Sequence, residues 1–121
     1  MLYFNKKMIK ITACLMGLFI GTGIPVLWAE SRAVEAGKVL TFDRKKGNCL
    51  SCHVIAGGTL MGTTGPPLMM MKLRFPDKEK LYKQVFDARK RNQKTIMPPF
   101  GSHAILSKEE VGAVVEYLYT L

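Results

Sequence analysis

Three residues near the middle of the chain, Cys49, Cys52 and His53, have the types and the spacing needed to hold a cofactor. They form the pattern Cys-x-x-Cys-His, which is the attachment sequence of a c-type haem. Each thiol can add to a haem vinyl group, and the imidazole that follows can then bind the iron. A redox-active dithiol and half of a zinc site also use Cys-x-x-Cys, but the first needs no adjacent histidine and the second needs more ligands than His103 alone can add. The pattern therefore favours one covalently bound haem c.

A haem bound by His53 has a second axial position, for which the sequence favours a methionine. Met97 precedes Pro98 and Pro99, which hold the backbone extended and can present the side chain to the iron. A thioether ligand stabilises ferrous haem, raises the reduction potential and suits electron transfer. The alternatives are that Met97 only packs beside the haem, that the position is open for ligand binding or peroxidase chemistry, or that another residue binds. The other possible ligands are His103, Met61, Met69, Met70 and Met71.

Glycine and proline are frequent in the segment 56–67, which predicts a loop instead of a helix or a central strand. The loop ends in Gly65, Pro66 and Pro67. A proline carbonyl here can accept a hydrogen bond from the ring nitrogen of His53 that faces away from the iron. Such a bond would fix the orientation of the imidazole and raise its basicity. The alternative is a rigid turn that does not contact the haem.

The surrounding sequence predicts an all-α fold, with a few short helices around one haem. Apolar positions at helical spacing indicate a first helix from Ser31 to about Lys46, and Gly47 with Asn48 should end it. Gly37 costs about 1 kcal/mol relative to alanine inside a helix. A close crossing with another helix would explain a glycine at this position.

Two further helices are expected after the loop. Asp77 is placed as the N-cap of the second, which should fade into the basic residues 89–91. Ser107 and Glu110 have the spacing of a capping box, which predicts that the last helix begins there and runs to the C-terminus. These helices would close the pocket around the haem.

The first 29 residues have the order of a secretory signal peptide. Three lysines precede the apolar run 11–24, and small residues follow near Ala29. We therefore expect a signal peptide at 1–29 and a single domain at 30–121, exported to the periplasm. Cleavage after Ala33 is an alternative.

An uncleaved anchor is a weaker alternative for this segment. The apolar run 11–24 is shorter than the roughly 20 residues needed to span a bilayer, and it contains Gly17, Gly21 and Gly23. Cys14 lies too early in the run for lipidation to be expected. The exported domain should therefore have no stable membrane insertion after the signal peptide is cleaved.

The chain is basic, with 18 Lys and Arg against 9 Asp and Glu and a formal net charge of +9. Residues 30–121 hold 15 of the basic residues and all nine acids, which leaves +6. Export removes nucleic acid as a partner. The remaining interpretations are a solvated basic face or a docking surface for an acidic redox partner, with residues 44–46 and 89–91 as candidates.

The predicted domain is small and has no spare cysteine. Both cysteines that remain after residue 29 belong to the motif, so no cysteine is left to form a structural disulfide that stabilises the fold. Chains of this length bury little apolar area on their own. A haem is therefore expected to provide part of the core.

The order helix, Cys-x-x-Cys-His, Gly-Pro-Pro loop, helix, Met-Pro-Pro loop and helix resembles class I cytochrome c. Within that class, four segments together resemble the SoxX subunit of bacterial SoxAX cytochromes. They are the haem motif at 47–53, Gly-Pro-Pro-Leu at 65–68, Met-Pro-Pro-Phe-Gly at 97–101 and the C-terminal stretch 105–121, which ends in Tyr-Leu-Tyr-Thr-Leu. The resemblance covers nearly all of residues 30–121.

The resemblance implies an electron-transfer subunit with a SoxA-like cytochrome as its heterodimer partner. That partner's own haem site would join thiosulfate oxidatively to a cysteine of a carrier protein. The chain would accept the electrons at a haem held by Cys49, Cys52, His53 and Met97, and would pass them to a soluble carrier. It would have no catalytic residue of its own. The alternative is a free soluble cytochrome that carries electrons to a terminal oxidase or reductase.

Overall fold

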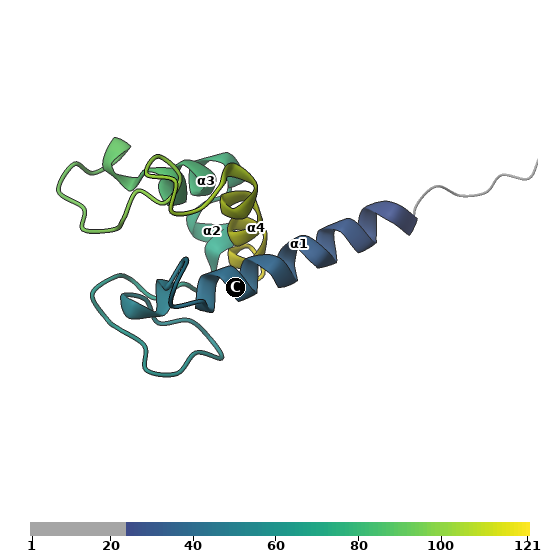
Figure 1. The fold of residues 1–121 in the computed structure, drawn as a ribbon, viewed down its shortest axis with the longest axis horizontal. Helices are drawn as coiled ribbons and strands as arrows, with labels where there is room; N and C mark the ends of the chain where they lie inside the picture. Colours follow the sequence, from purple (N-terminus) through teal and green to yellow (C-terminus); the bar gives the residue numbers. More distant parts are fainter. Residues whose placement is uncertain (1–23) are drawn as a thin grey trace, which may run out of the picture.

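The computed structural model describes residues 24–121, and every regular element in that range is a helix. The elements are α1 (Ile24–Phe42), η1 (Cys49–Ser51), α2 (Met71–Arg74), α3 (Lys78–Phe86), η2 (Ala88–Lys90) and α4 (Lys108–Leu118), where η marks a short 3₁₀ helix. In Figure 1, α2, α3 and α4 gather into one body, and α1 passes this body and extends beyond it. This architecture confirms the predicted all-α fold.

The bounds of α1 differ from the predicted helix. The sequence predicts a helix from Ser31 to about Lys46, whereas α1 spans Ile24–Phe42. The helix ends early because Asp43 begins a turn. The Asp43 carbonyl accepts hydrogen bonds from the backbone N–H groups of Lys46, at 3.2 Å, and Asn48, at 2.9 Å. The predicted end near Lys46 was therefore wrong.

The N-terminal predictions fall mostly outside the described residues. Residues 1–23 include the predicted charged region, most of the apolar run and Cys14. α1 passes through Ala29, the predicted end of the signal peptide. The division into 1–29 and 30–121 stays a prediction. Within residues 24–121, none of the helices combines the length and apolar character required for crossing a membrane.

α1 and α4 meet at a close crossing centred on Gly37. A Cβ atom on Gly37 would collide with the backbone carbonyl of Ala113 in α4. Only glycine allows this approach, which confirms the reason predicted for its presence. The hydroxyl of Thr41 is buried nearby and donates to the Gly37 carbonyl at 2.7 Å. The crossing therefore buries no unpaired hydroxyl.

The hydrophobic core lies beside this crossing and draws most heavily on α4. One face of α4 is buried from Val111 to Leu118, as expected for an amphipathic helix. Residues from α2, α3 and the loops pack against it. The core side chains are Ile55, Met71, Leu81, Val85, Phe100, Leu106, Val111, Val114, Val115, Tyr117 and Leu118.

α3 begins as predicted but ends sooner. Asp77 is its N-cap and accepts a hydrogen bond from the backbone N–H of Glu79 at 3.0 Å, which confirms its predicted role. The helix stops at Phe86, because the Asp87 side chain caps the start of η2. The basic residues 89–91 therefore lie beyond α3, and the prediction that they form its positive end was wrong.

α4 begins with the predicted capping box. The hydroxyl of Ser107 accepts from the backbone N–H of Glu110 at 3.2 Å, and the Glu110 carboxylate accepts from the backbone N–H of Ser107 at 2.8 Å. The hydrogen bond from the Ser107 N–H lowers the pKa of Glu110, and the Lys46 ammonium lowers it further. Lys46 Nζ lies 3.0 Å from Glu110 Oε1, so an ion pair joins the turn before the haem motif to the start of α4.

Candidate functional site

Cys49, Cys52 and His53 lie on one short turn of the backbone. The Cys49 carbonyl accepts from the N–H groups of Cys52, at 3.2 Å, and His53, at 2.9 Å. Asn48 enters the turn with a φ of 47°, in the left-handed region that asparagine tolerates better than most residues. The turn brings all three side chains to the wall of one cavity.

His53 is held by the loop that follows the motif. Its Nδ1 atom lies 2.7 Å from the carbonyl oxygen of Pro66. A carbonyl can only accept, so Nδ1 must carry the proton, which leaves Nε2 with a free lone pair. A carbonyl partner of this kind orients an iron-bound imidazole and raises its basicity. The hydrogen bond confirms the predicted contact between the Gly-Pro-Pro loop and the histidine.

Gly65 lets this loop lie directly against the imidazole. A Cβ atom on Gly65 would collide with the His53 ring. The backbone N–H of Gly65 donates to the Cys52 carbonyl at 2.7 Å, and that of Leu68 donates to the Val54 carbonyl at 2.9 Å. The loop thus fixes the plane of the ring from one side.

The cavity that these residues share has a volume of about 730 Å³. This volume lies within the roughly 300–1,000 Å³ of typical cofactor and ligand pockets. Its walls are largely apolar, and they come from α2, α3, α4 and the loop before α4. The apolar lining residues include Leu68, Met71, Leu81, Val85, Phe100 and Leu106. An apolar macrocycle therefore has room and a matching environment here.

Met97 lies on the wall of the same cavity, on the loop between η2 and α4. Figure 1 shows this loop and the loop after η1 at the end of the body that lies away from the projecting end of α1. The Met97 side chain is half-buried, and its backbone N–H donates to the Thr95 hydroxyl at 3.2 Å. His53 and Met97, which the sequence predicts as the two axial ligands, therefore line the same cavity.

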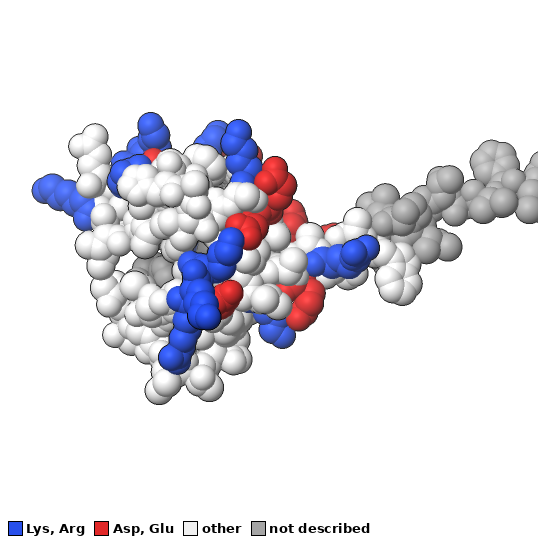
Figure 2. Space-filling view, in the orientation of Figure 1, with Lys and Arg blue, Asp and Glu red and all other residues white. Residues whose placement is uncertain are grey.

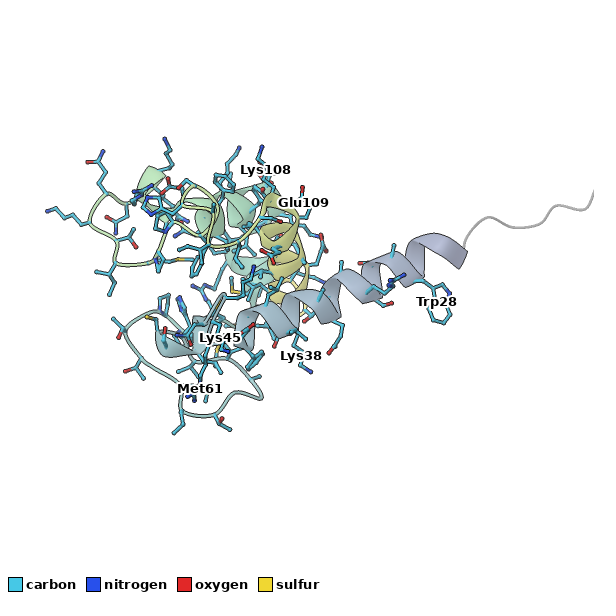
Figure 3. The ribbon with its side chains drawn as sticks, in the orientation of Figure 1. Trp28, Lys38, Lys45, Met61, Lys108 and Glu109 are labelled. Carbon is cyan, nitrogen blue, oxygen red and sulfur yellow. The ribbon has the colours of Figure 1, made fainter. Side chains whose placement is uncertain are left out.

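Most of the rival ligands lie elsewhere. Nε2 of His103 is 3.2 Å from the Arg89 guanidinium, outside the cavity. Met61 lies on the loop after η1, where its sulfur accepts from the backbone N–H of Ile55 at 3.2 Å (Figure 3). Met69 and Met70 are exposed. Apart from Met97, Met71 is the one candidate that reaches the cavity wall, and it is buried in the core.

Comparison with known proteins agrees with this geometry. The family model described as "Cytochrome C oxidase, cbb3-type, subunit III" matches residues 34–118. The chain belongs to this family of cytochrome c domains. It is also 31% identical, over 104 residues and 82% of its length, to an "Uncharacterized lipoprotein" of Aquifex aeolicus (strain VF5). The chain spans about half of that relative, 47% of its length.

This membership makes the chain a class I c-type cytochrome domain, which binds haem and transfers electrons. The cavity residues fit that group. Two thiols and an imidazole come from the motif, a thioether comes from the loop before α4, and apolar side chains fill the walls between them. When bound, haem supplies an iron that changes oxidation state by one electron. The protein supplies its ligands and its apolar surroundings.

The alternative interpretations of the two cysteines fit the structure less well. Cys49 and Cys52 are half-buried and form no disulfide. Burial raises the pKa of the Cys49 thiol to about 11, whereas redox-active cysteines have a lowered pKa. No group of three or more His, Cys, Asp and Glu side chains could hold a metal ion within residues 24–121. A zinc site therefore lacks its remaining ligands in the described part of the cytochrome.

Four cationic side chains line the cavity: Arg44, Lys46, Arg74 and Arg91. Arg74 Nη1 donates to the Pro67 carbonyl at 2.6 Å, and the Arg91 guanidinium lies 5.7 Å from the centre of the Phe75 ring. These cations can receive the acidic groups at the edge of a haem. Figure 2 shows Lys and Arg side chains at several places on the face in view, with Asp and Glu side chains among them.

Asp87 is a structural residue that the sequence did not single out. It is 5% exposed, and its carboxylate accepts from Arg89 and from the Ser102 hydroxyl. Arg89, and then Ser102, hold the pKa of Asp87 well below its usual range. The sequence gives little indication that Asp87 is buried and paired, because an aspartate two residues before an arginine is common on protein surfaces. The contact with Ser102 depends on the path of the whole intervening loop.

Proposed function

We propose that this cytochrome domain carries one haem c, attached through Cys49 and Cys52, with His53 and Met97 as the two axial ligands. One observation carries the proposal: the two thiols, the imidazole and the thioether line a single apolar cavity. The hydrogen bond from His53 Nδ1 to Pro66 supports it, because it leaves Nε2 for the iron. With both axial positions filled, electron transfer is favoured over ligand binding or peroxidase chemistry.

Covalent attachment can be tested by changing the two cysteines. We expect the variant Cys49→Ala/Cys52→Ala to lose all haem on a denaturing gel stained for haem. Each single variant should keep one thioether bond. Ser51→Ala is the matched control, because Ser51 lies between the cysteines and is exposed. Haem that stays with the double variant after denaturation would contradict the proposal.

The finer role that we propose is that of a SoxX-like subunit in the periplasm. The resemblance of the segments 47–53, 65–68, 97–101 and 105–121 to SoxX supports this role. The order of residues 1–29 supports export, as does a relative that is named a lipoprotein. The chain would accept electrons from a SoxA-like partner and pass them to a soluble carrier. The alternative is a free soluble carrier that serves a terminal oxidase or reductase.

The two roles differ in whether a stable partner exists. We expect the full chain, co-expressed in an exporting host with the SoxA-like cytochrome of the same genome, to elute with it as a heterodimer. In the SoxX-like role the chain is not catalytic on its own, so thiosulfate-dependent reduction of its haem should require the partner. A monomeric holoprotein that does not bind the partner and that reduces a terminal oxidase would favour the free carrier instead.

A further inference from the structure

The loop that carries Met97 begins and ends at the same place. It leaves α3 after Phe86 and returns at Gly101 and Ser102. The Phe86 carbonyl accepts from the backbone N–H groups of Gly101, at 2.9 Å, and Ser102, at 3.2 Å. A Cβ atom on Gly101 would collide with the Phe86 ring, so the two ends of the loop are in close contact.

Asp87 accepts four hydrogen bonds at the base of the loop, three from its outgoing end and one from its returning end. On the outgoing end, its carboxylate accepts from Arg89 at the backbone N–H (3.2 Å), at Nε (2.8 Å) and at Nη2 (2.8 Å). On the returning end, it accepts from the Ser102 hydroxyl at 2.8 Å. Arg89 Nη2 also donates to Ser102 at 3.2 Å, which closes a triangle. Charge-assisted bonds of this bidentate kind are stronger and more directional than neutral ones.

Between these ends, the backbone hydrogen bonds of the loop are local, and one longer side-chain contact leaves it: Gln84 Nε2 in α3 lies 4.0 Å from the Met97 sulfur. The backbone N–H of Asn92 donates to the Ala88 carbonyl, that of Thr95 to Asn92, and that of Met97 to the Thr95 hydroxyl. Local bonds set the shape of each turn but do not fix the position of the loop relative to the haem cavity. The short hydrogen bonds that tie the loop to the end of α3 are therefore at its base, and they limit where Met97 can lie.

We propose that Asp87 is a positioning residue for Met97: together with Arg89 and Ser102 it clasps the base of the loop and holds the thioether at the haem cavity. This inference rests on the proposed role of Met97 as the axial ligand. Asp87 itself does not line the haem cavity, so it acts only through the loop. Without the clasp, the loop opens more often and Met97 leaves the iron more readily.

The rate at which added imidazole displaces Met97 from the ferric holoprotein tests this role. Imidazole can bind only while the loop is open, and loss of the far-red sulfur-to-iron band follows the reaction. We expect Asp87→Asn to speed the displacement about tenfold or more, the factor expected for losing a charge-assisted hydrogen bond. Ser102→Ala, which keeps the pair of Asp87 with Arg89, should give a smaller increase.

Asp77→Asn is the matched control, because Asp77 caps the other end of α3 in the same way, through a backbone N–H two residues on. Asparagine caps a helix about as well as aspartate, so this variant should keep the cap and leave the displacement rate unchanged. Equal rates in the wild type, Asp87→Asn and Ser102→Ala would overturn the proposal, as would equal acceleration by Asp77→Asn. If Asp87→Asn does not retain haem, the displacement rate of Ser102→Ala relative to the wild type decides whether the proposal holds.

Hydrogen exchange at the backbone amides of residues 94–100 separates this proposal from the ligand assignment. The clasp predicts faster exchange in the Asp87→Asn holoprotein than in the wild type or Asp77→Asn, whichever residue binds the iron. If the wild type lacks the sulfur-to-iron band but exchange is faster in Asp87→Asn, Met97 is not the ligand and Asp87 still holds the base of the loop. If exchange is unchanged in Asp87→Asn, Asp87 does not hold the base of the loop.

Discussion

Replacing Met97 with leucine should abolish the weak far-red sulfur-to-iron band of the ferric protein and lower its reduction potential. Leucine has a similar volume and is apolar, so the cavity wall should stay filled. The thioether that stabilises the ferrous state is lost. We expect a fall on the order of 0.1 V, a modest part of the roughly 0.8 V that axial ligands span in haem proteins. Optical spectra and a redox titration of the holoprotein measure both effects.

Met71→Leu is the informative comparison for this experiment. Met71 is the other methionine of the described residues that reaches the cavity, and at 1% exposed it is well packed. The band should survive this substitution. A band that persists in Met97→Leu and disappears in Met71→Leu would transfer the ligand role to Met71. A band that persists in both would contradict methionine ligation by either residue.

Substituting Gly37 with alanine should destabilise the fold by about 1–3 kcal/mol, the usual cost of overpacking. Helix propensity alone predicts a gain in stability instead, because alanine is favoured over glycine by about 1 kcal/mol inside a helix. At Gly37 the added methyl would meet the backbone carbonyl of Ala113, which cannot move without shifting α4. Urea unfolding of the holoprotein at equilibrium gives the change.

Gly112→Ala provides the matched control in α4. A Cβ atom at Gly112 would have nothing within 4 Å, so only the higher helix propensity of alanine should change the stability. We expect a gain in stability of up to about 1 kcal/mol. If Gly37→Ala were as stable as Gly112→Ala, the close crossing of α1 and α4 would not be needed for the fold.

Features with a local chemical cause were predictable from the sequence. The haem motif, the capping box at Ser107 and the N-cap at Asp77 each depend on residues only a few positions apart. The bond between His53 and Pro66 was also predictable, although the two residues lie 13 positions apart. An iron-bound histidine usually donates its other ring N–H to a carboxylate, a backbone carbonyl or water, and a Gly-Pro-Pro loop has carbonyls with little local competition.

Features that depend on tertiary contacts were not predictable in this way. The end of α1 is set by the turn at Asp43, which competes with the helix for the same backbone groups. The clasp at Asp87 requires Ser102, which follows after a long loop. The prolines after Met97 favoured it over the other methionines, but only the fold shows that Met71 also reaches the cavity. In each case a non-local contact decides between local structures that the sequence permits equally.

His53 and Met97 together would fill both axial positions of one haem, which suits electron transfer and not ligand chemistry. Carbon monoxide binding to the ferrous holoprotein, recorded together with the ferric far-red spectrum, shows whether both positions are filled. We expect a clear sulfur-to-iron band in the ferric form and slow or negligible binding of carbon monoxide in the ferrous form. Rapid, complete carbon monoxide binding without that band would show an open sixth position and rule out ligation by both His53 and Met97.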